Sequence, residues 1–227
     1  MKRLTCNSRV ESNAFAAFSA AMLLWVCIAA FDARAAESES RSDTVYIAQF
    51  HPINSKVTGL HAAGEARLAV SGDTLTITIN AEGVPPDLVH WQHFHGFTDN
   101  RAATCPTARA DANSDGIIDL IETEPAAGTT MVPFTDNPAA MDVPHGTYPK
   151  ASAAGTYTYR QTVSLKELTA AFGKTFKDQA LDLDRRVIFI HGVVPSSTLP
   201  PSVASLGSIP ADVTLPIACG KIERVHR

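Results

Sequence analysis

The stretch ARLAVSGDTLTITINAEG, residues 66–83, alternates apolar and polar side chains on both sides of Gly72-Asp73. Alternation with a period of two places the apolar residues on one face of an extended strand. A Gly-Asp pair between two such runs is typical of a β-hairpin turn. We therefore expect two antiparallel strands here that cover a hydrophobic core with one face.

Further strands follow elsewhere in the chain, separated by Gly, Pro and Asn residues, and a single segment, residues 165–173, has the composition of a helix. Strands and helices do not alternate, which predicts an all-β fold, an antiparallel sandwich or barrel. Two long loops, residues 98–154 and 195–212, exceed what a compact domain usually contains. The further strands are expected at residues 44–50, 88–97, 156–165, 186–194 and 213–222.

The start of the chain combines Lys2 and Arg3 with an apolar run over residues 14–31 and the small-residue sequence ARA at residues 33–35. This order is typical of a secretory signal peptide. A membrane anchor is the alternative, because the run approaches the length of a spanning helix. We expect removal, and therefore a secreted or periplasmic protein with no membrane span. The expected organisation is a signal peptide at residues 1–35, a disordered lead-in at residues 36–43 and one domain at residues 44–227.

Removal of the signal peptide changes the formal net charge from −4 to about −6. A negative chain is a poor match for a phosphate backbone, which excludes nucleic acid as a partner class. Cys6 and Cys27 leave with the signal peptide, so Cys105 and Cys219 remain. In an oxidising compartment these two are expected to pair, the alternative being two separate buried thiols.

Three histidines lie close together in LVHWQHFHGF, residues 88–97. On a strand, His93 and His95 share one face and His90 lies on the other. An H-x-H pair can bring two neutral imidazoles to one ion, and imidazole suits copper and zinc. Further ligands would come from His191, at the end of VIFIH, and from His145, in DVPHGTY. The alternative is that these are partly buried side chains hydrogen-bonded to the backbone.

The segments HWQHFHGF, VIFIHG and LPIACGKI resemble, in order and rough spacing, the copper-zinc superoxide dismutase superfamily and the related CHRD-type domains. The resemblance covers most of residues 57–223 and implies an immunoglobulin-like Greek-key β-barrel. It implies that His93, His95 and His191 are copper ligands and that His90 supports them. It also implies a disulfide between the two remaining cysteines, Cys105 and Cys219, which would tie the first long loop to the barrel.

Two departures from the family pattern concern the metals and the substrate. The family places a bridging histidine and the zinc ligands soon after its first cysteine, but here no histidine follows until His145. We therefore expect no zinc site, with His145 as the candidate for the remaining copper ligand. The family also has an arginine just before ACG that guides superoxide, and here Pro216 or Ile217 stands in that neighbourhood.

The segment DANSDGIIDLIE, residues 111–122, satisfies the twelve-residue pattern D-x-N-x-D-G-x-x-D-x-x-E of a calcium loop. Gly116 allows the sharp turn, and six to eight hard oxygen ligands suit calcium. The alternative is a solvated acidic loop. No helix precedes the segment, because Cys105-Pro106 is too close, so we expect one structural calcium site and no paired EF-hand sensor. The expected ligands are Asp111, Asn113, Asp115, the Ile117 carbonyl, Asp119 and Glu122.

Two functions remain open at this point. The first is an exported copper-binding β-barrel protein with superoxide dismutase activity, whose partners are metal ions and superoxide. The second is a non-catalytic, calcium-stabilised CHRD-type module that binds a protein partner or mediates adhesion at the cell envelope. A hydrolase is a poor third choice, because the sequence contains no nucleophile elbow and no H-E-x-x-H motif.

Overall fold

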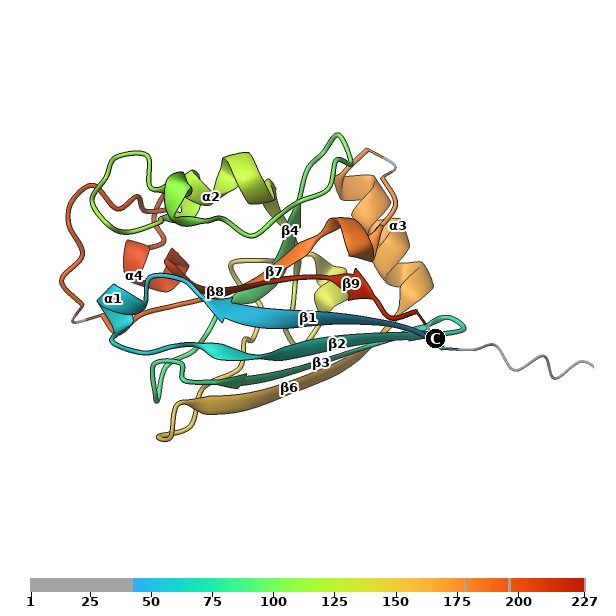
Figure 1. Cartoon of the computed structure of the whole chain (residues 1–227). Coiled ribbons are helices and arrows are strands. Elements are labelled where there is room, and N and C mark those ends of the chain that lie inside the picture. Colours follow the sequence, from blue (N-terminus) through green and yellow to red (C-terminus); the bar gives the residue numbers. More distant parts are fainter. Residues whose placement is uncertain (1–42, 178, 196, 227) are drawn as a thin grey trace, which may run out of the picture. The chain divides into compact units, whose positions relative to one another are not determined.

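The computed structural model describes residues 43–177, 179–195 and 197–226. The predicted signal peptide and almost all of the predicted lead-in lie outside these residues. Every strand pairing in the described part is antiparallel, and the strands form one path, β5-β4-β7-β8-β1-β2-β3-β6, with β9 on β1 (Figure 1). The strands are β1 Thr44–Pro52, β2 Ala63–Ser71, β3 Thr74–Glu82, β4 Gln92–Gly96, β5 Thr129–Pro133, β6 Thr156–Ser164, β7 Val187–His191, β8 Pro216–Lys221 and β9 Glu223–Arg224.

Strand β1 joins the two halves of this sheet. Most of its length pairs with β2, whereas its last residues, His51 and Pro52, pair with β8. Non-consecutive neighbours such as β3 with β6 and β4 with β7 require connections that cross between the halves, as in a Greek-key arrangement. The predicted all-β fold, an antiparallel sandwich or barrel, is therefore confirmed.

The hairpin predicted around Gly72-Asp73 is formed by β2 and β3. Its register runs without interruption from Ala63 with Glu82 to Ser71 with Thr74. Gly72 adopts a φ of 58°, in the left-handed region that a tight turn needs and glycine tolerates. The alternating apolar residues are buried as expected and belong to the main core: Leu68, Leu75, Ile77, Ile79 and Ala81.

The other half of the sheet separates two cores. On one face of β4 and β7, Phe94, Ile188 and Ile190 pack into the main core. On the opposite face, Val187 and Phe189 belong to a smaller cluster that also contains residues of the first long loop. The loop therefore covers the second face of the sheet, and side chains that alternate along β4 and β7 are buried on both sides.

Four helices and three 3₁₀ turns complete the described residues. None of the helices is long and apolar enough to cross a membrane. The predicted helix at residues 165–173 is present and extends slightly further, as α3, whose Leu168 and Phe172 are buried in the main core. The bounds are α1 Ser55–Thr58, α2 Leu120–Ala127, α3 Leu165–Thr175, α4 Ala211–Thr214, η1 Ala108–Ala110, η2 Pro138–Ala140 and η3 Leu183–Arg185.

The first long loop contains structure that the sequence did not predict. Helix α2 and strand β5 both fall within residues 98–154. The helix contains Pro125 and has little amphipathic character, so its hydrophobic pattern is weak. Its start nevertheless has a capping box, in which the side chains of Asp119 and Glu122 bond each other's backbone N–H groups. The expectation of an unbroken loop was wrong because these two residues were interpreted only as metal ligands.

The strand predicted over residues 88–97 is shorter than expected. Only Gln92–Gly96 forms β4. Before it, Val89 makes an isolated bridge to Lys150 and is 46% exposed, and the His90 N–H donates to the carbonyl of Pro149. Pro149, which accepts this hydrogen bond, has no N–H group with which to donate one back to His90, and this prevents regular strand pairing there. The alternation therefore applies to His93 and His95, but not continuously back to Val89.

The disulfide between Cys105 and Cys219 is present and ties the first long loop to β8. The two Cα atoms lie 5.8 Å apart, and the cysteines are separated by 114 positions in sequence. Cys219 belongs to the smaller core, and Cys105 packs against it. The bridge thus fixes the loop against the face of the sheet that carries His93 and His95.

Replacing both cysteines by serine in residues 36–227 is expected to lower the free energy of unfolding by about 4 to 5 kcal/mol, because the closed loop restricts the unfolded chain. Urea denaturation of the oxidised protein and of the double variant measures the difference. Addition of a reductant should lower the urea midpoint of the unmodified protein and leave the midpoint of the double variant unchanged. Equal urea midpoints for the two oxidised proteins would contradict the prediction.

Candidate metal centre

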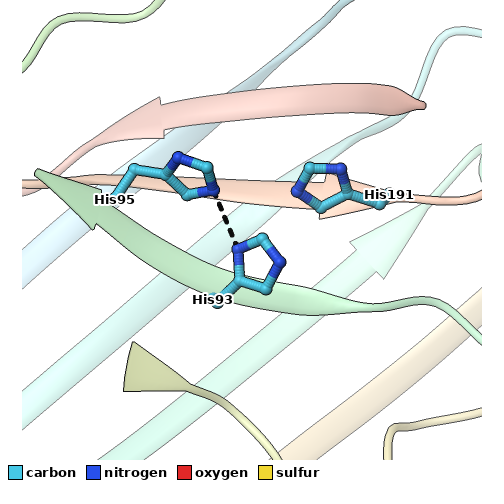
Figure 2. A group of neighbouring side chains, drawn as sticks. All are labelled: His93, His95 and His191. Atoms are coloured by element: carbon cyan, nitrogen blue, oxygen red, sulfur yellow. Dashed lines mark hydrogen bonds between the residues drawn. The ribbon is translucent and has the colours of Figure 1, made fainter. Parts of the chain in front are cut away.

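His93, His95 and His191 come together on the loop-covered face of the sheet, and we call them the histidine triad (Figure 2). His93 and His95 lie on β4, and His191 is the last residue of β7. These strands pair antiparallel, with His93 opposite Phe189. Residues opposite each other and residues two apart share a face, so all three imidazoles project from the same side. The arrangement follows from the H-x-H spacing and the register of β4 with β7.

The ligand atoms of the triad are close enough to surround one ion. One nitrogen of each ring lies within 4.8 Å of the others, and Nδ1 of His93 lies 3.0 Å from Nε2 of His95. Metal–imidazole bonds of about 2.0–2.1 Å place neighbouring nitrogens about 3 Å apart and opposite nitrogens about 4 Å apart. A small movement of the His191 ring toward the other two rings would bring the three nitrogens to these distances.

Backbone carbonyls set the orientation of two of the rings. Nδ1 of His95 lies 3.3 Å from the Gly128 carbonyl, and Nδ1 of His191 lies 2.7 Å from the Thr214 carbonyl. A carbonyl only accepts hydrogen bonds, so Nδ1 carries the proton in each ring and Nε2 keeps a lone pair. In metal sites of proteins, the ring nitrogen that does not bind the metal usually donates such a hydrogen bond, which fixes the orientation of the imidazole.

The lone pair of His191 has no other use in the described part of the chain. Its Nε2 is buried and has no hydrogen-bond partner there. A buried acceptor without a partner is costly, and an ion placed among the three rings would satisfy it. The residues present therefore fit a metal that prefers nitrogen ligands, such as copper or zinc.

Burial keeps the triad in the neutral form that binds metals. The exposed fractions of His93, His95 and His191 are 3%, 1% and 2%. Loss of hydration lowers the pKa of His95 to about 3 and that of His191 to about 4, and it holds the pKa of His93 well below its usual value. Repulsion between neighbouring imidazolium charges lowers the pKa values of His93 and His95 further. A cation can therefore bind without displacing protons at neutral pH.

His90 lies outside the triad and contacts the backbone that carries it. Its ring is fully buried, stacks on Tyr157 with centroids 5.9 Å apart, and places Nδ1 3.0 Å from the carbonyl of His191. Its Nε2 lies 2.9 Å from the carbonyl of Pro85. Burial lowers the pKa of His90 despite these two acceptors. The ring thus connects the end of β7 to the segment before β4.

The structure does not bring His145 to the triad. Its side chain is 80% exposed, and its Nδ1 lies 2.9 Å from Asp142 on the same turn. Within the described residues, the group of converging metal-ligand side chains contains only the three buried histidines. The fourth ligand expected from sequence therefore has to come from another residue or from outside the chain.

The acidic side chains of the segment 111–122 accept hydrogen bonds mostly from backbone N–H groups of the same segment. Asp111 accepts hydrogen bonds from the N–H groups of Asp115 and Gly116, and Glu122 accepts from those of Ala112 and Asn113. Gly116 has a φ of 85°, which a residue with a side chain rarely adopts. The remaining predicted ligand side chains accept from nearby backbone N–H groups: Asn113 from Asp115, Asp115 from Ile117, and Asp119 from Glu122 and Ala204.

Three residues around the triad were not predicted. Gly128 and Thr214 act through backbone carbonyls, so their side chains gave no signal in the sequence. Thr130 places its Oγ1 3.1 Å from Nε2 of His95. It lies on β5, in a region that was expected to be a loop, so the sequence did not predict the face of the sheet on which its side chain lies.

Comparisons with known proteins give no family assignment. The sequence matches no protein-family model. No curated protein matches it either. Among solved structures, the chain is similar to the Cu/Zn superoxide dismutase from Brucella abortus, with 21% identity, a TM-score of 0.42, and coverage of 80% of this chain and 100% of that chain.

Replacing His93 or His191 by alanine is expected to abolish stoichiometric copper binding, because each change removes one of only three converging nitrogens. Metal analysis after dialysis against a weak chelator measures the retained copper. His145→Ala is the matched control and should retain copper, since that ring lies on an exposed turn. Circular dichroism distinguishes loss of the site from loss of the fold. Full copper occupancy in folded His93→Ala protein would refute the assignment.

Proposed function

We propose that this chain is an exported copper-binding protein and that the histidine triad holds the metal. The convergence of three neutral, buried imidazoles with an unsatisfied nitrogen on His191 carries this proposal. Three imidazoles suit either copper or zinc, and at equal availability copper(II) binds nitrogen sites more tightly. The resemblance of HWQHFHGF to the copper-ligand strand of the dismutases also favours copper.

We propose superoxide dismutation as the reaction of this centre. His93, His95 and His191 would hold copper, whose cupric and cuprous states would supply the one-electron oxidation of one superoxide to dioxygen and the one-electron reduction of a second, with two protons, to hydrogen peroxide. The Gly128 and Thr214 carbonyls would hold the imidazole planes fixed while the charge of the site changes. Burial of the triad would restrict access to small reactants.

The chain has no arginine just before ACG, where the dismutases have the arginine that guides superoxide to copper. Pro216 and Ile217 are both buried and uncharged. Attraction of an anion to a site depends on nearby positive charge, and without it the association rate falls toward that of unguided diffusion. The proposed enzyme would therefore be slower than a dismutase with an arginine there.

The copper-loaded protein, residues 36–227, is expected to dismutate superoxide with a rate constant per copper that exceeds that of free copper and falls short of the diffusional ceiling of about 10⁸ to 10⁹ M⁻¹s⁻¹. Pulse radiolysis or stopped-flow decay of superoxide measures this rate. His95→Ala protein treated in the same way controls for adventitious copper. If wild-type protein retains copper but is no faster than free copper, the dismutase proposal fails and the binding-module alternative remains.

We also propose that residues 111–122 bind calcium and thereby order the first long loop. The complete twelve-residue pattern supports this proposal, as does the turn at Gly116, which brings Asp111 within hydrogen-bond distance of the backbone N–H groups of Asp115 and Gly116. A stabilised loop of this kind would suit either a metal enzyme or a surface module that binds a partner at the cell envelope.

Calcium is expected to raise the unfolding temperature, with stabilisation of about 2.7 kcal/mol at a concentration one hundred times the dissociation constant. Glu122→Gln should abolish this effect, because the neutral amide removes a bidentate ligand yet still permits the capping box of α2. Glu124→Gln is the matched control, since Glu124 is exposed on α2 outside the loop. Thermal unfolding with calcium, with magnesium and with a chelator provides the test. Identical curves for wild-type protein would contradict the calcium site.

A further inference from the structure

Thr130 lies opposite His95 because the pairing of β4 with β5 is irregular. The register places Phe94 opposite Val132 and then shifts, so that His95 faces Thr130. Regular pairing would have placed Met131 against His95, but Met131 is instead buried in the main core. A bulge of this kind redirects a side chain, and residues directly opposite in an antiparallel pair project from the same face. The bulge therefore turns Thr130 toward the triad.

The Thr130 hydroxyl contacts a nitrogen that a metal would use. Its Oγ1 lies 3.1 Å from Nε2 of His95, and the same Nε2 lies 3.0 Å from Nδ1 of His93. Because Nδ1 of His95 donates to the Gly128 carbonyl, Nε2 carries a lone pair and the hydroxyl donates to it. A metal bound to this lone pair would take the place of the hydroxyl proton and would lie within reach of Oγ1.

We propose that the Thr130 hydroxyl is the fourth donor of the centre and completes a set of three nitrogens and one oxygen. This inference rests on the proposed copper-binding function of the triad. Ligand atoms next to each other around an ion with bonds of about 2.0–2.2 Å are separated by about 3 Å, which the 3.1 Å contact satisfies. Thr130 is also the one partly exposed residue among the four, whereas the imidazoles are buried.

An oxygen donor distinguishes between the two oxidation states of copper. A neutral hydroxyl is a hard ligand, which interacts more strongly with copper(II) than with the softer copper(I). Three imidazoles are enough for copper(I). Thr130 therefore stabilises the oxidised form selectively and sets the preference of the site between the two states.

Three variants of residues 36–227, the chain without the predicted signal peptide, test this role. Thr130→Val removes the hydroxyl and keeps the branched shape, while Thr130→Ser keeps the hydroxyl. Thr129→Val makes the same chemical change at the exposed neighbouring residue, which pairs with Gly96 and projects from the opposite face. Affinities for copper(II) and, without oxygen, for copper(I) are measured by competition with chelators, and the copper(II) environment is measured by electron paramagnetic resonance.

Thr130→Val is expected to weaken copper(II) binding by roughly tenfold, to change the copper(II) resonance parameters, and to leave the copper(I) affinity within about a factor of two. Thr130→Ser and Thr129→Val should resemble wild type. Equal weakening of both oxidation states would show a merely structural effect and would overturn the inference, as would an unchanged copper(II) affinity and spectrum. If wild-type protein binds no copper, the proposed function fails together with this inference. If wild-type and Thr130→Val proteins bind copper identically, only this inference fails.

Discussion

The pairing of β4 with β7 is the constraint on which the candidate centre depends. Because the register sets His93 opposite Phe189, alternate residues of both strands sort onto two faces. Phe94, Ile188 and Ile190 enter the main core on one face. The triad and Phe189 occupy the other. A shift of one residue in this register would reverse the faces and place imidazoles in the hydrophobic core.

The second face is buried although it carries three titratable side chains. Burial of a charged imidazole is unfavourable, so the fold keeps the rings neutral, and the pKa values of all three are lowered. Two rings satisfy their N–H groups on the carbonyls of Gly128 and Thr214. The nitrogen left on His191 has no such partner in the described chain. A cation among the rings would offset the cost of that unsatisfied acceptor, which explains why the arrangement suits a metal ion.

The sequence predicted those features that depend on local periodicity. Alternation around Gly72-Asp73 predicted the hairpin, and the H-x-H spacing predicted that His93 and His95 share a face. Features that depend on distant backbone could not be predicted in this way. Thr130 lies opposite His95 because of a β-bulge, in which one strand has an extra residue, and the sequence of β5 contains no pattern that predicts the bulge. His145 was a candidate ligand by residue type alone, and residue type does not determine whether the fold brings a side chain to the triad. The structure places this histidine on an exposed turn.

Hydrogen bonds connect the acidic loop to the triad through two routes. In the first, Asn54, which has a left-handed backbone, bonds both the N–H and the carbonyl of Ile118 and also the carbonyl of Pro216 at the start of β8. In the second, the carboxylates of Asp115 and Asp119 accept hydrogen bonds from Ser202 and from the N–H of Ala204.

The segment of Ser202 and Ala204 continues to Thr214, whose carbonyl fixes His191. The acidic loop is therefore joined through Asn54 to Pro216, which pairs with His191, and through Ala204 to the segment that leads to Thr214. The two candidate sites are best understood as one connected polar structure on the outer face of the sheet, with the disulfide holding the loop in contact with that face.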